Sequence, residues 1–534
     1  MDNSSFDRFG VMIDNSRNAV MNVDSVKKYI DLLKKVGCDF LMLYTEDTYE
    51  VNGRPYFGHH RGKYLKSELI ELDAYAKSRG VELCPCIQTL AHLNALMRWP
   101  EFSKLADSGD TLCAGDEEVY RLIDDIFATL NECFTSKTVN IGMDEAENIG
   151  LGRYLREHGL ENRMDILVRH LKRVAEIAAK YGFTLLMWGD MFYKLAGGPE
   201  DKADFDRKLS ESIPENVNLI YWDYYSLEKE HYDLRILNYR KLRDDIWFAG
   251  GLWTWTGFTP HISYALKATE AAVKSCAEHN VKNVFMTLWG DNGGETSRFS
   301  VVPALFAAAE FARGNFDMDS IKEKFFKEFG IAFDDFMLAE LPGTPNTDNL
   351  SINNPEKYML YSDPFMGNLD ALVKGDEAER FAACGKKLEK MIENKEYGNV
   401  FEVPYRICRV LELKYDLGVR TRKAYQSGDR ETLSNLIPVY DETVKRIEEF
   451  YSALEKWWMA ENKPHGFDVQ DIRIGGLLMR MKHCRQRLAG YLGGSIGRIE
   501  ELEDKELHPF CANDGGRGAV CYNSWGLSAT CNVL

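Results

Sequence analysis

Residues 32–43 read LLKKVGCDFLML, in which the basic end of an amphipathic helix meets a glycine and then a short apolar run. The same pattern returns at YAKSRGVELCPC (75–86) and IAAKYGFTLLMW (177–188), and with an asparagine at CAEHNVKNVFMT (276–287). Glycine, and next to it asparagine, suits the left-handed residue that closes a helix, and basic residues in the last turn complement the helix dipole. The apolar run is typical of a strand buried on both faces. The sequence therefore predicts a repeated helix–turn–strand unit.

Extending this pattern along the first 300 residues predicts eight strands with helices between most of them, for example at 24–36, 66–79 and 163–180. The predicted strands are GVMID (10–14), FLMLYTED (40–47), ELCPCIQT (82–89), TVNIGMDE (138–145), TLLMWGDM (184–191), VNLIYWDY (217–224), IWFAGGLWTW (246–255) and NVFMTLWGDN (283–292). Alternating strands and helices indicate a parallel sheet, and eight such units favour a closed (β/α)₈ TIM barrel of the α/β class. An open doubly wound sheet is the alternative.

After residue 315 the alternation of predicted strands and helices ends, and the sequence shows helical periodicity instead. The turn-rich segment PGTPNTDNLSINNP (342–355) predicts a linker, and apolar residues at three- and four-residue spacing predict helices at 367–394, 405–427, 429–460 and 468–503. We therefore expect a catalytic barrel over 1–315 and an all-α C-terminal domain over 316–534. The Glu, Lys and Arg runs of this second half are typical of solvated helix faces. An alternative interpretation of Trp457-Trp458 is a contact between two copies of the chain, so the sequence leaves the possibility of a homodimer open.

Composition excludes several classes of partner. The chain of 534 residues has a formal net charge of −17, which disfavours nucleic acid and anionic membranes as partners because binding them needs a basic face. No apolar run is long enough to span a membrane, and the first residues as they stand lack a secretory signal pattern. The twelve cysteines are scattered, as expected of reduced thiols in a cytoplasmic protein. Cys511, Cys521, Cys531 and His508 have no usual zinc spacing, so we expect no metal.

A barrel places its chemistry at the carboxyl ends of its strands. Five of the ten tryptophans, at 188, 222, 253, 255 and 289, fall at the ends of the last four predicted strands, among aspartates, glutamates and tyrosines. Flat apolar rings pack against the C–H face of a sugar, and charged groups bind its hydroxyls. These residues predict a carbohydrate pocket; the alternative is that the aromatic rings only fill the barrel.

The stretch TVNIGMDEAENIG (138–150) ends its predicted strand on two adjacent carboxylates, Asp144 and Glu145. In a water-poor pocket two carboxyls cannot both ionise freely, so one pKa rises and that group can act as an acid near neutral pH. Glu145 is the acid candidate because its side chain is longer, and Asp144 is expected to stay ionised. In most glycosidases the two carboxyls flank the scissile bond about 5–9 Å apart, which neighbours on one strand cannot do. The adjacency favours the exception in which the substrate's 2-acetamido group is the nucleophile.

With this pair in place, residues 9–300 resemble the catalytic barrel of the family 20 glycoside hydrolases, the β-N-acetylhexosaminidases. The family motif H/N-x-G-G/M-D-E matches Asn140 to Glu145. A branch without the small N-terminal domain is similar at LYTEDTYEVNGRPYFGHHRGKY (43–64), IQTLAHLNALMRW (87–99), MDEAENIGLGRY (143–154) and TLWGDNGGE (287–295). The resemblance covers the whole predicted barrel, with its motifs in order on the expected strands.

The resemblance implies roles for residues at matching positions. Glu145 is expected to be the general acid/base and Asp144 the partner of the acetamido nitrogen, supported by His92 with Asp47 or Glu46. The expected sugar contacts are Arg17 in DNSR (14–17) and Asp291 at the hydroxyls, Trp188, Trp222 and Trp289 as aromatic walls, and Tyr224, Tyr225 or Trp255 near the acetamido group. Cys86, where an acidic residue is expected, Asn148, where a histidine is expected, and the Trp253–Trp255 segment, where a tyrosine is expected, depart from the family pattern.

These observations predict a retaining exo-β-N-acetylhexosaminidase that removes terminal β-linked GlcNAc or GalNAc through an oxazolinium-type intermediate, without cofactor or metal. Its substrate would be an oligosaccharide or a glycoconjugate glycan. Two alternatives stay open. One is a barrel glycosidase with two separated carboxylates, for example Glu145 with Glu46 or Asp291; the other is a catalytically silent sugar-binding barrel.

Overall fold

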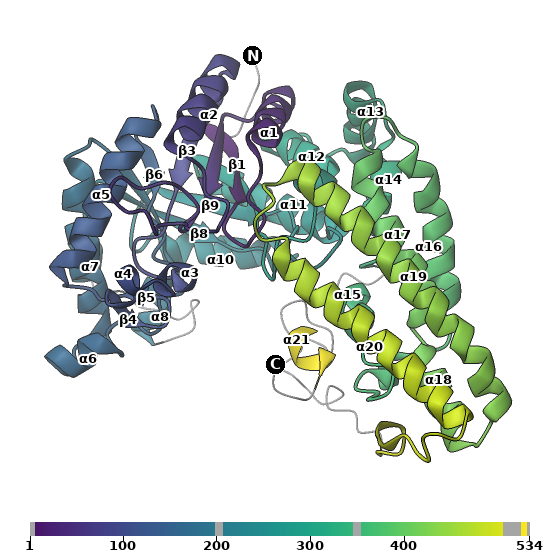
Figure 1. Cartoon of the computed structure of the whole chain (residues 1–534). Coiled ribbons are helices and arrows are strands. Elements are labelled where there is room, and N and C mark those ends of the chain that lie inside the picture. Colours follow the sequence, from purple (N-terminus) through teal and green to yellow (C-terminus); the bar gives the residue numbers. More distant parts are fainter. Residues whose placement is uncertain (1–5, 198–204, 206, 345–353, 506–524, 531–534) are drawn as a thin grey trace. The chain divides into compact units, whose positions relative to one another are not determined.

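The computed structural model describes residues 6–197, 205, 207–344, 354–505 and 525–530, which form two compact units (Figure 1). The barrel unit comprises Met1–Leu252, Ala265–Trp289 and Ala304–Glu323, and the helical unit comprises Trp253–Tyr264, Gly290–Pro303 and Lys324–Leu534. The segments that follow the last two barrel strands thus belong to the helical unit, whereas the predicted barrel covers all of 1–315. Most of the predicted linker (345–353) and the group His508, Cys511, Cys521 and Cys531 lie outside the described residues.

Eight parallel strands close the barrel in the order β1-β10-β9-β8-β7-β6-β3-β2. The strands are β1 Arg8–Asp14, β2 Phe40–Tyr44, β3 Glu82–Cys86, β6 Thr138–Asn140, β7 Thr184–Trp188, β8 Val217–Trp222, β9 Ile246–Gly251 and β10 Asn283–Leu288. β1 pairs with both β2 and β10, which completes the ring. The predicted closed barrel is confirmed, and the alternative of an open sheet is wrong.

Helices between the strands cover the outside of the barrel (Figure 1). The helices of this part of the chain are α1 Val23–Val36, α2 Lys66–Arg79, α3 Asn94–Met97, α4 Pro100–Ser103, α5 Glu117–Cys133, α6 Arg153–His158, α7 Arg163–Ala179, α8 Asp190–Ala196, α9 Arg207–Ser212, α10 Lys229–Tyr239 and α11 Ile262–Glu278, and α12 Val302–Ala312 follows the last strand. A two-stranded antiparallel hairpin, β4 Ala106–Ser108 with β5 Thr111–Leu112, lies in the connection after β3.

Helix α1 shows why the repeated unit folds as predicted. The side chain of Asn22 accepts the N–H of Ser25 at the start of the helix, and Gly37 closes it with a φ of 79°. Tyr29, Ile30 and Leu33 on its inner face are fully buried. Local capping thus sets the ends of the helix, and burial of one apolar face holds it on the barrel.

The strands are shorter than predicted at their carboxyl ends. β1 ends at Asp14 as expected, but every other barrel strand stops earlier; β6, for example, ends at Asn140 rather than at Glu145. The residues beyond the last ladder bond form loops that carry the polar side chains. This is where a (β/α)₈ barrel keeps its chemistry.

The helical unit contains α13 to α21 and is all-α, as predicted. Its helices are α13 Met318–Phe329, which also supplies the last residues of the barrel unit, then α14 Phe333–Phe336, α15 Pro355–Tyr361, α16 Glu377–Ile392, α17 Gly398–Lys414, α18 Leu417–Gln426, α19 Arg430–Glu461, α20 Asp468–Leu492 and α21 Trp525–Ala529. Four 3₁₀ turns accompany the helices, η1 Arg298–Val301, η2 Met337–Glu340, η3 Asp370–Leu372 and η4 Glu500–Leu502. α16 packs on α17, α17 on α19, and α19 on α20. The single helix predicted at 405–427 is therefore two helices, α17 and α18.

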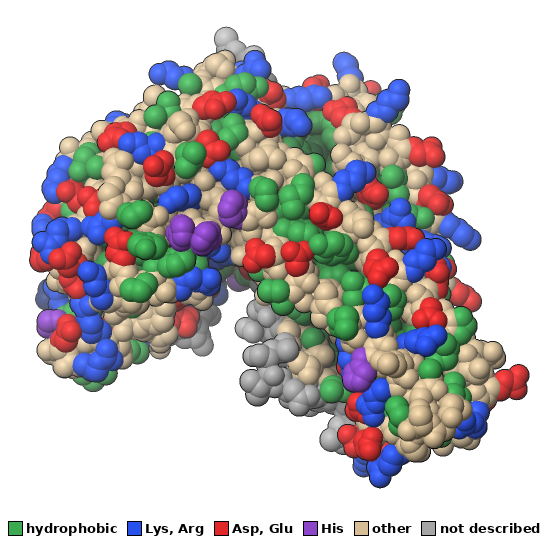
Figure 2. Space-filling view, in the orientation of Figure 1, with side chains coloured by type: hydrophobic (Ala, Val, Ile, Leu, Met, Phe, Trp, Pro, Cys, Tyr) green, Lys and Arg blue, Asp and Glu red, His purple; other side chains and the backbone are tan. Residues whose placement is uncertain are grey.

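The apolar core of the helical unit includes Phe401, Leu411, Ile447 and Leu454, all fully buried. Acidic and basic side chains mix over the visible surface of the helices, as expected of solvated faces (Figure 2). Lys482 and Glu448, for example, lie 3.1 Å apart with about half of each side chain exposed.

Trp457 and Trp458 belong to this core. Trp458 is fully buried and packs edge-on against Phe467, and the indole N–H of Trp457 donates to Glu461 at 2.7 Å. The interpretation of this pair as a contact to a second copy is therefore wrong, because the chain's own residues already cover both rings. Among the described residues, no helix combines the length and the apolar character needed to cross a bilayer, and the described cysteines are free, buried thiols.

Candidate active site

The loop after β6 carries the adjacent carboxylates. Between the end of the strand and Glu145 the backbone turns sharply, with positive φ at Gly142 (74°), Met143 (70°) and Glu145 (51°). A Cβ atom on residue 142 would lie 2.1 Å from the side-chain oxygen of Gln88 and 2.8 Å from the backbone oxygen of Ile87. Glycine is thus required there, because it allows both the left-handed backbone and the close approach of the segment that follows β3. The turn separates the two carboxylates that the sequence places side by side.

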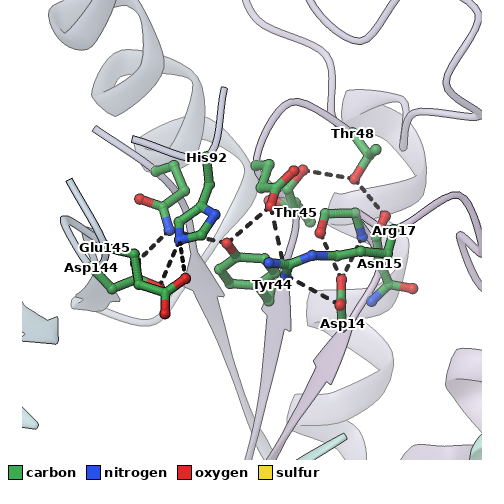
Figure 3. A network of polar contacts seen from close by, with 12 residues as sticks. Asp14, Asn15, Arg17, Tyr44, Thr45, Thr48, His92, Asp144 and Glu145 are labelled. Carbon is green, nitrogen blue, oxygen red and sulfur yellow. Dashed lines mark hydrogen bonds and ion pairs between the residues drawn. The ribbon is translucent and has the colours of Figure 1, made fainter. Parts of the chain in front are cut away.

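Asp144 points into the protein. The amide nitrogen of Gln88 donates to Oδ1 at 2.7 Å, and Nε2 of His92 lies 3.2 Å from Oδ2 (Figure 3). Burial alone would raise the pKa of Asp144, but the charge of His92 and the hydrogen bonds outweigh it and hold the pKa below its usual value. Asp144 is therefore ionised near neutral pH, as the sequence analysis expected.

His92 lies between the two carboxylates. Its Nε2 is also 3.6 Å from Oε2 of Glu145, as the converging contacts in Figure 3 show. Burial lowers the pKa of His92, but Asp144 raises it more, and the result is a pKa of about 9. The site thus holds an imidazolium that neutralises Asp144.

Glu145 is the more open of the pair, with half of its side chain exposed. Its backbone N–H donates to Oδ2 of Asp190 at 3.1 Å, and its carboxylate lies 3.8 Å from Nζ of Lys194. Burial raises the pKa of Asp190 to about 6, and the charge of Asp144 adds to that rise. Asp144 is thus buried and held by Gln88 and His92, whereas half of the Glu145 side chain is exposed.

A second polar cluster follows β1 and β2. Arg17 lies 3.2 Å from Asp14 and 3.6 Å from Glu46, and its guanidinium lies over the rings of Tyr44 and Trp289, 5.0 Å from each. The hydroxyl of Tyr44 donates to Glu46 and accepts from the same Gln88 nitrogen that binds Asp144. Figure 3 shows Tyr44 between Arg17 and the carboxylate pair. One continuous network of ion pairs and hydrogen bonds therefore joins Arg17 to Asp144.

Aromatic rings follow β7, β8 and β10. Trp188 and Trp289 lie 6.0 Å apart, and the indole N–H of Trp289 donates to the hydroxyl of Tyr224 at 2.9 Å. Tyr224 is buried and stacks on Trp222 at 5.3 Å. Tyr225, in contrast, is 43% exposed. The structure thus brings Trp188, Trp222, Tyr224 and Trp289 together, and Tyr225 lies further out.

The roles of three further predicted site residues, Asp47, Trp255 and Asp291, stay predictions. Asp47 is buried and pairs with Arg61 at 3.2 Å, so the residue that enters the network is its neighbour Glu46. Trp255 and Asp291 belong to the helical unit; there Trp255 stacks on Trp253 at 4.6 Å. The buried thiol of Cys86, which stands where an acidic residue is expected, contacts the sulfur of Met12 at 3.8 Å.

Four residues of this site were not among the predicted site residues: Tyr44, Gln88, Asp190 and Lys194. Three of them follow or end a strand, which is the only signal that the sequence carries for them. Lys194 lies one helical turn after Asp190, and this spacing is too common in helices to indicate a site residue from the sequence. In the described part of the chain no group of three His, Cys, Asp or Glu side chains is placed to hold a metal ion.

A closed parallel barrel that presents a carboxylate pair, an arginine and a group of tryptophans at its strand ends has the features of a glycoside hydrolase. The model of the glycosyl hydrolase family 20 catalytic domain matches residues 41–231, and that of the glycoside hydrolase 20C C-terminal domain matches residues 334–520. The chain belongs to glycoside hydrolase family 20.

The chain is also similar to named proteins. A β-hexosaminidase of Akkermansia muciniphila is 27% identical over 215 residues, 34% of this chain and 43% of that protein. Hexosaminidase D of Bos taurus is 24% identical over 284 residues, 50% of this chain and 75% of that protein. The crystal structure of a β-N-acetylhexosaminidase from Bacteroides fragilis aligns with a TM-score of 0.48 and 21% identity over 60% of this chain and 69% of that one. The chain thus spans less than half of its Akkermansia relative.

Proposed function

We propose that this protein is a retaining exo-β-N-acetylhexosaminidase that removes terminal β-linked GlcNAc or GalNAc by substrate-assisted catalysis. The observation that carries the proposal is the division of the Asp144–Glu145 pair into one buried, ionised carboxylate and one half-exposed carboxylate. Its relatives are named hexosaminidases, which agrees with an acetamido sugar as substrate.

In the first step Glu145 donates its proton to the glycosidic oxygen as the bond from that oxygen to C1 breaks. The acetamido oxygen attacks C1 from the opposite face and forms an oxazolinium ring. Asp144 accepts a hydrogen bond from the acetamido nitrogen and stabilises its positive charge. A carboxylate held by Gln88 and His92 needs little reorganisation for this role.

In the second step a water molecule attacks C1, gives a proton to Glu145 and breaks the bond to the acetamido oxygen. Two inversions at C1 leave the configuration retained, and Glu145 regains its proton. No carboxylate of the protein forms a bond to the sugar.

The remaining residues would bind the sugar. Arg17 presents a guanidinium fork, held by Asp14 and Glu46, for two neighbouring hydroxyls. Trp188, Trp222 and Trp289 would line the pocket, and Tyr224 would donate to the acetamido oxygen, since its hydroxyl already accepts from Trp289. Roles for Asp47, Tyr225, Trp255 and Asp291 rest on the family resemblance alone. A cytoplasmic location and a homodimer stay predictions, which cell fractionation and light scattering would test.

The alternative with two separated carboxylates has less support. Glu46, its candidate nucleophile, already binds Arg17 and Tyr44, and burial raises its pKa. A nucleophile must instead be ionised and open to C1.

The test compares the wild-type protein with Glu145→Gln. We expect the wild type to hydrolyse nitrophenyl β-GlcNAc and N,N′-diacetylchitobiose but not nitrophenyl β-glucoside, which lacks the acetamido group. The variant should lose about 10²- to 10⁴-fold in kcat on the disaccharide, because its leaving group needs the acid. Glu157→Gln, an exposed carboxylate paired with Arg153, is the control. Comparable turnover of the glucoside would contradict the acetamido mechanism, and no turnover of any substrate would favour a silent sugar-binding barrel.

A further inference from the structure

Asp190 is a buried carboxylate that the mechanism above does not use. It is the first residue of α8, directly after β7, and only 1% of it is exposed. Its Oδ2 accepts the backbone N–H of Glu145, and its Oδ1 has no hydrogen-bond partner among the described residues. A buried acidic group with one unsatisfied oxygen is unfavourable for stability, so a functional reason for it is worth testing.

Lys194 lies one helical turn after Asp190 and faces the same loop. Its Nζ is 3.4 Å from Oδ2 of Asp190, 3.8 Å from Oε1 of Glu145 and 3.0 Å from Oε1 of Glu147. Asp190 therefore contacts the main chain of Glu145, and Lys194 contacts its carboxylate. Both contacts come from a single short helix.

Glu145 needs such support because its backbone is left-handed, with a φ of 51°. A non-glycine residue in this region costs on the order of 1 kcal/mol or more and persists only where its surroundings hold it. The hydrogen bond from its N–H to Asp190 is one such restraint. Proton donation to a glycosidic oxygen also depends on the direction in which the carboxyl points.

We propose that Asp190 and Lys194 are positioning residues that set the orientation of Glu145 for proton transfer. This proposal rests on the proposed function, in which Glu145 is the acid/base. In this arrangement neither residue gives or takes the transferred proton: Asp190 contacts the backbone of Glu145, and Lys194 lies 3.8 Å from its carboxylate. Both act through Glu145, Asp190 from its backbone side and Lys194 from its carboxylate side.

The charges around Asp190 predict a pH dependence for this arrangement. The charged groups that face it are Asp144, Glu145 and Lys194. Burial raises the pKa of Asp190 to about 6, and the charge of Asp144 adds to that rise. Above this pH the ionised carboxylate accepts strongly from the Glu145 N–H and pairs with Lys194. Below it the protonated group is a weaker acceptor and the pairing is lost. Activity that depends on the alignment of Glu145 should therefore fall as the pH drops through about 6.

The experiment measures kcat and KM of Asp190→Asn, Asp190→Ala and Lys194→Met on N,N′-diacetylchitobiose and on nitrophenyl β-GlcNAc. Asparagine keeps the size and one acceptor oxygen, whereas alanine removes both. We expect kcat on the disaccharide to fall about 10- to 100-fold with little change in KM, the size of effect that misplacing a catalytic group produces. The fall on the nitrophenyl substrate should be smaller, because its leaving group needs little protonation. In Asp190→Asn the change of activity near pH 6 should also disappear.

Two controls match the variants. Asp73→Asn changes another buried aspartate that accepts a backbone N–H, that of Thr135 at 3.1 Å, and Lys180→Met removes an exposed lysine paired with Asp124. Both should leave the ratio of the two kcat values unchanged.

Three outcomes separate the possibilities. An unchanged kcat in all three site variants would overturn the positioning role. Equal losses on the two substrates with an unchanged pH profile would also overturn it, since that result indicates a merely structural role. A wild-type protein that hydrolyses neither substrate would contradict the proposed function itself.

Discussion

At the scale of single residues, Asp144 and His92 stabilise each other's charged forms. The pKa of Asp144 lies below its usual value and that of His92 lies at about 9, although burial acts against both charges. Asp144 is adjacent to Glu145 in the chain, yet its chemistry is set by His92 and Gln88, which follow another strand. Two adjacent carboxylates thus lie in different surroundings.

This pair predicts how stability depends on pH. The folded state binds the His92 proton more tightly than the unfolded state, in which the pKa is about 6.5. The resulting stabilisation, on the order of 3 kcal/mol, is complete below pH 6.5 and is lost as the pH rises through about 9. Urea unfolding of the wild type and of His92→Gln should therefore differ most near pH 6 and converge near pH 10.

His170 provides a comparison of opposite sign. Burial lowers its pKa to about 4, so its contribution is lost as the pH falls below 6.5. His170→Gln should therefore change the acid side of the stability curve and not the alkaline side. A difference between wild type and His92→Gln that stays constant from pH 6 to pH 10 would contradict the ion pair with Asp144.

At the scale of elements, the loop after β6 depends on Gly142. Gly142→Ala would place a methyl group against Gln88 and against the backbone oxygen of Ile87, in a backbone conformation that alanine disfavours. We expect it to destabilise the protein by about 2 kcal/mol or more and to lower kcat, because Gln88 can then no longer hold Asp144. Thermal unfolding and hydrolysis of nitrophenyl β-GlcNAc measure the two effects.

Gly182→Ala is the matched control for this substitution. Its φ is also 74°, but nothing lies within 4 Å of the added Cβ. It should lower the free energy of unfolding only through backbone strain, by about 1 kcal/mol, and leave kcat unchanged. Equal effects of the two substitutions would show that the contact with Ile87 and Gln88 is unimportant.

The predicted ends of the helices and strands match the observed ends where a local signal sets them and differ elsewhere. The bounds of α2 at Lys66 and Arg79 match the prediction, because the helix ends at a local signal, Gly80. The end of β6 does not match, since Ile141 and Met143 are apolar and fully buried although they lie beyond the strand. Buried apolar residues give the same sequence pattern in a strand as in a tight loop, so the sequence does not show where the strand ends.

At the scale of the whole molecule, the segment that follows β10 belongs to the helical unit. Glu295 on this segment is fully buried, and it accepts from Lys357 of α15 and from Gln470 and Arg473 of α20. Arg473 also donates to the backbone oxygen of Asn292. The charge cluster therefore ties a strand-end segment to helices that lie far along the chain.

Lys357→Met should destabilise the helical unit by about 3–5 kcal/mol, because it leaves Glu295 with less compensating charge in a buried place. Calorimetry should show the loss as a lower unfolding temperature. Adding Glu295→Gln to this variant should recover part of it. Lys482→Met, which breaks the exposed pair with Glu448, should change stability by no more than about 0.5 kcal/mol. A Lys357→Met protein as stable as this control would contradict a structural role for the cluster.

The sequence alone determined the closed barrel and the all-α second half, and it singled out the adjacent carboxylates Asp144 and Glu145. These follow from local signals, since helix stops such as Gly37 and buried runs such as 40–44 are set by neighbours in the chain. Only the tertiary structure decided that Glu46 rather than Asp47 joins Arg17, that Gln88 holds Asp144, and that Asp190 supports Glu145. Those contacts join residues on different strand ends, and their charges depend on burial and distance, which arise only when the barrel closes.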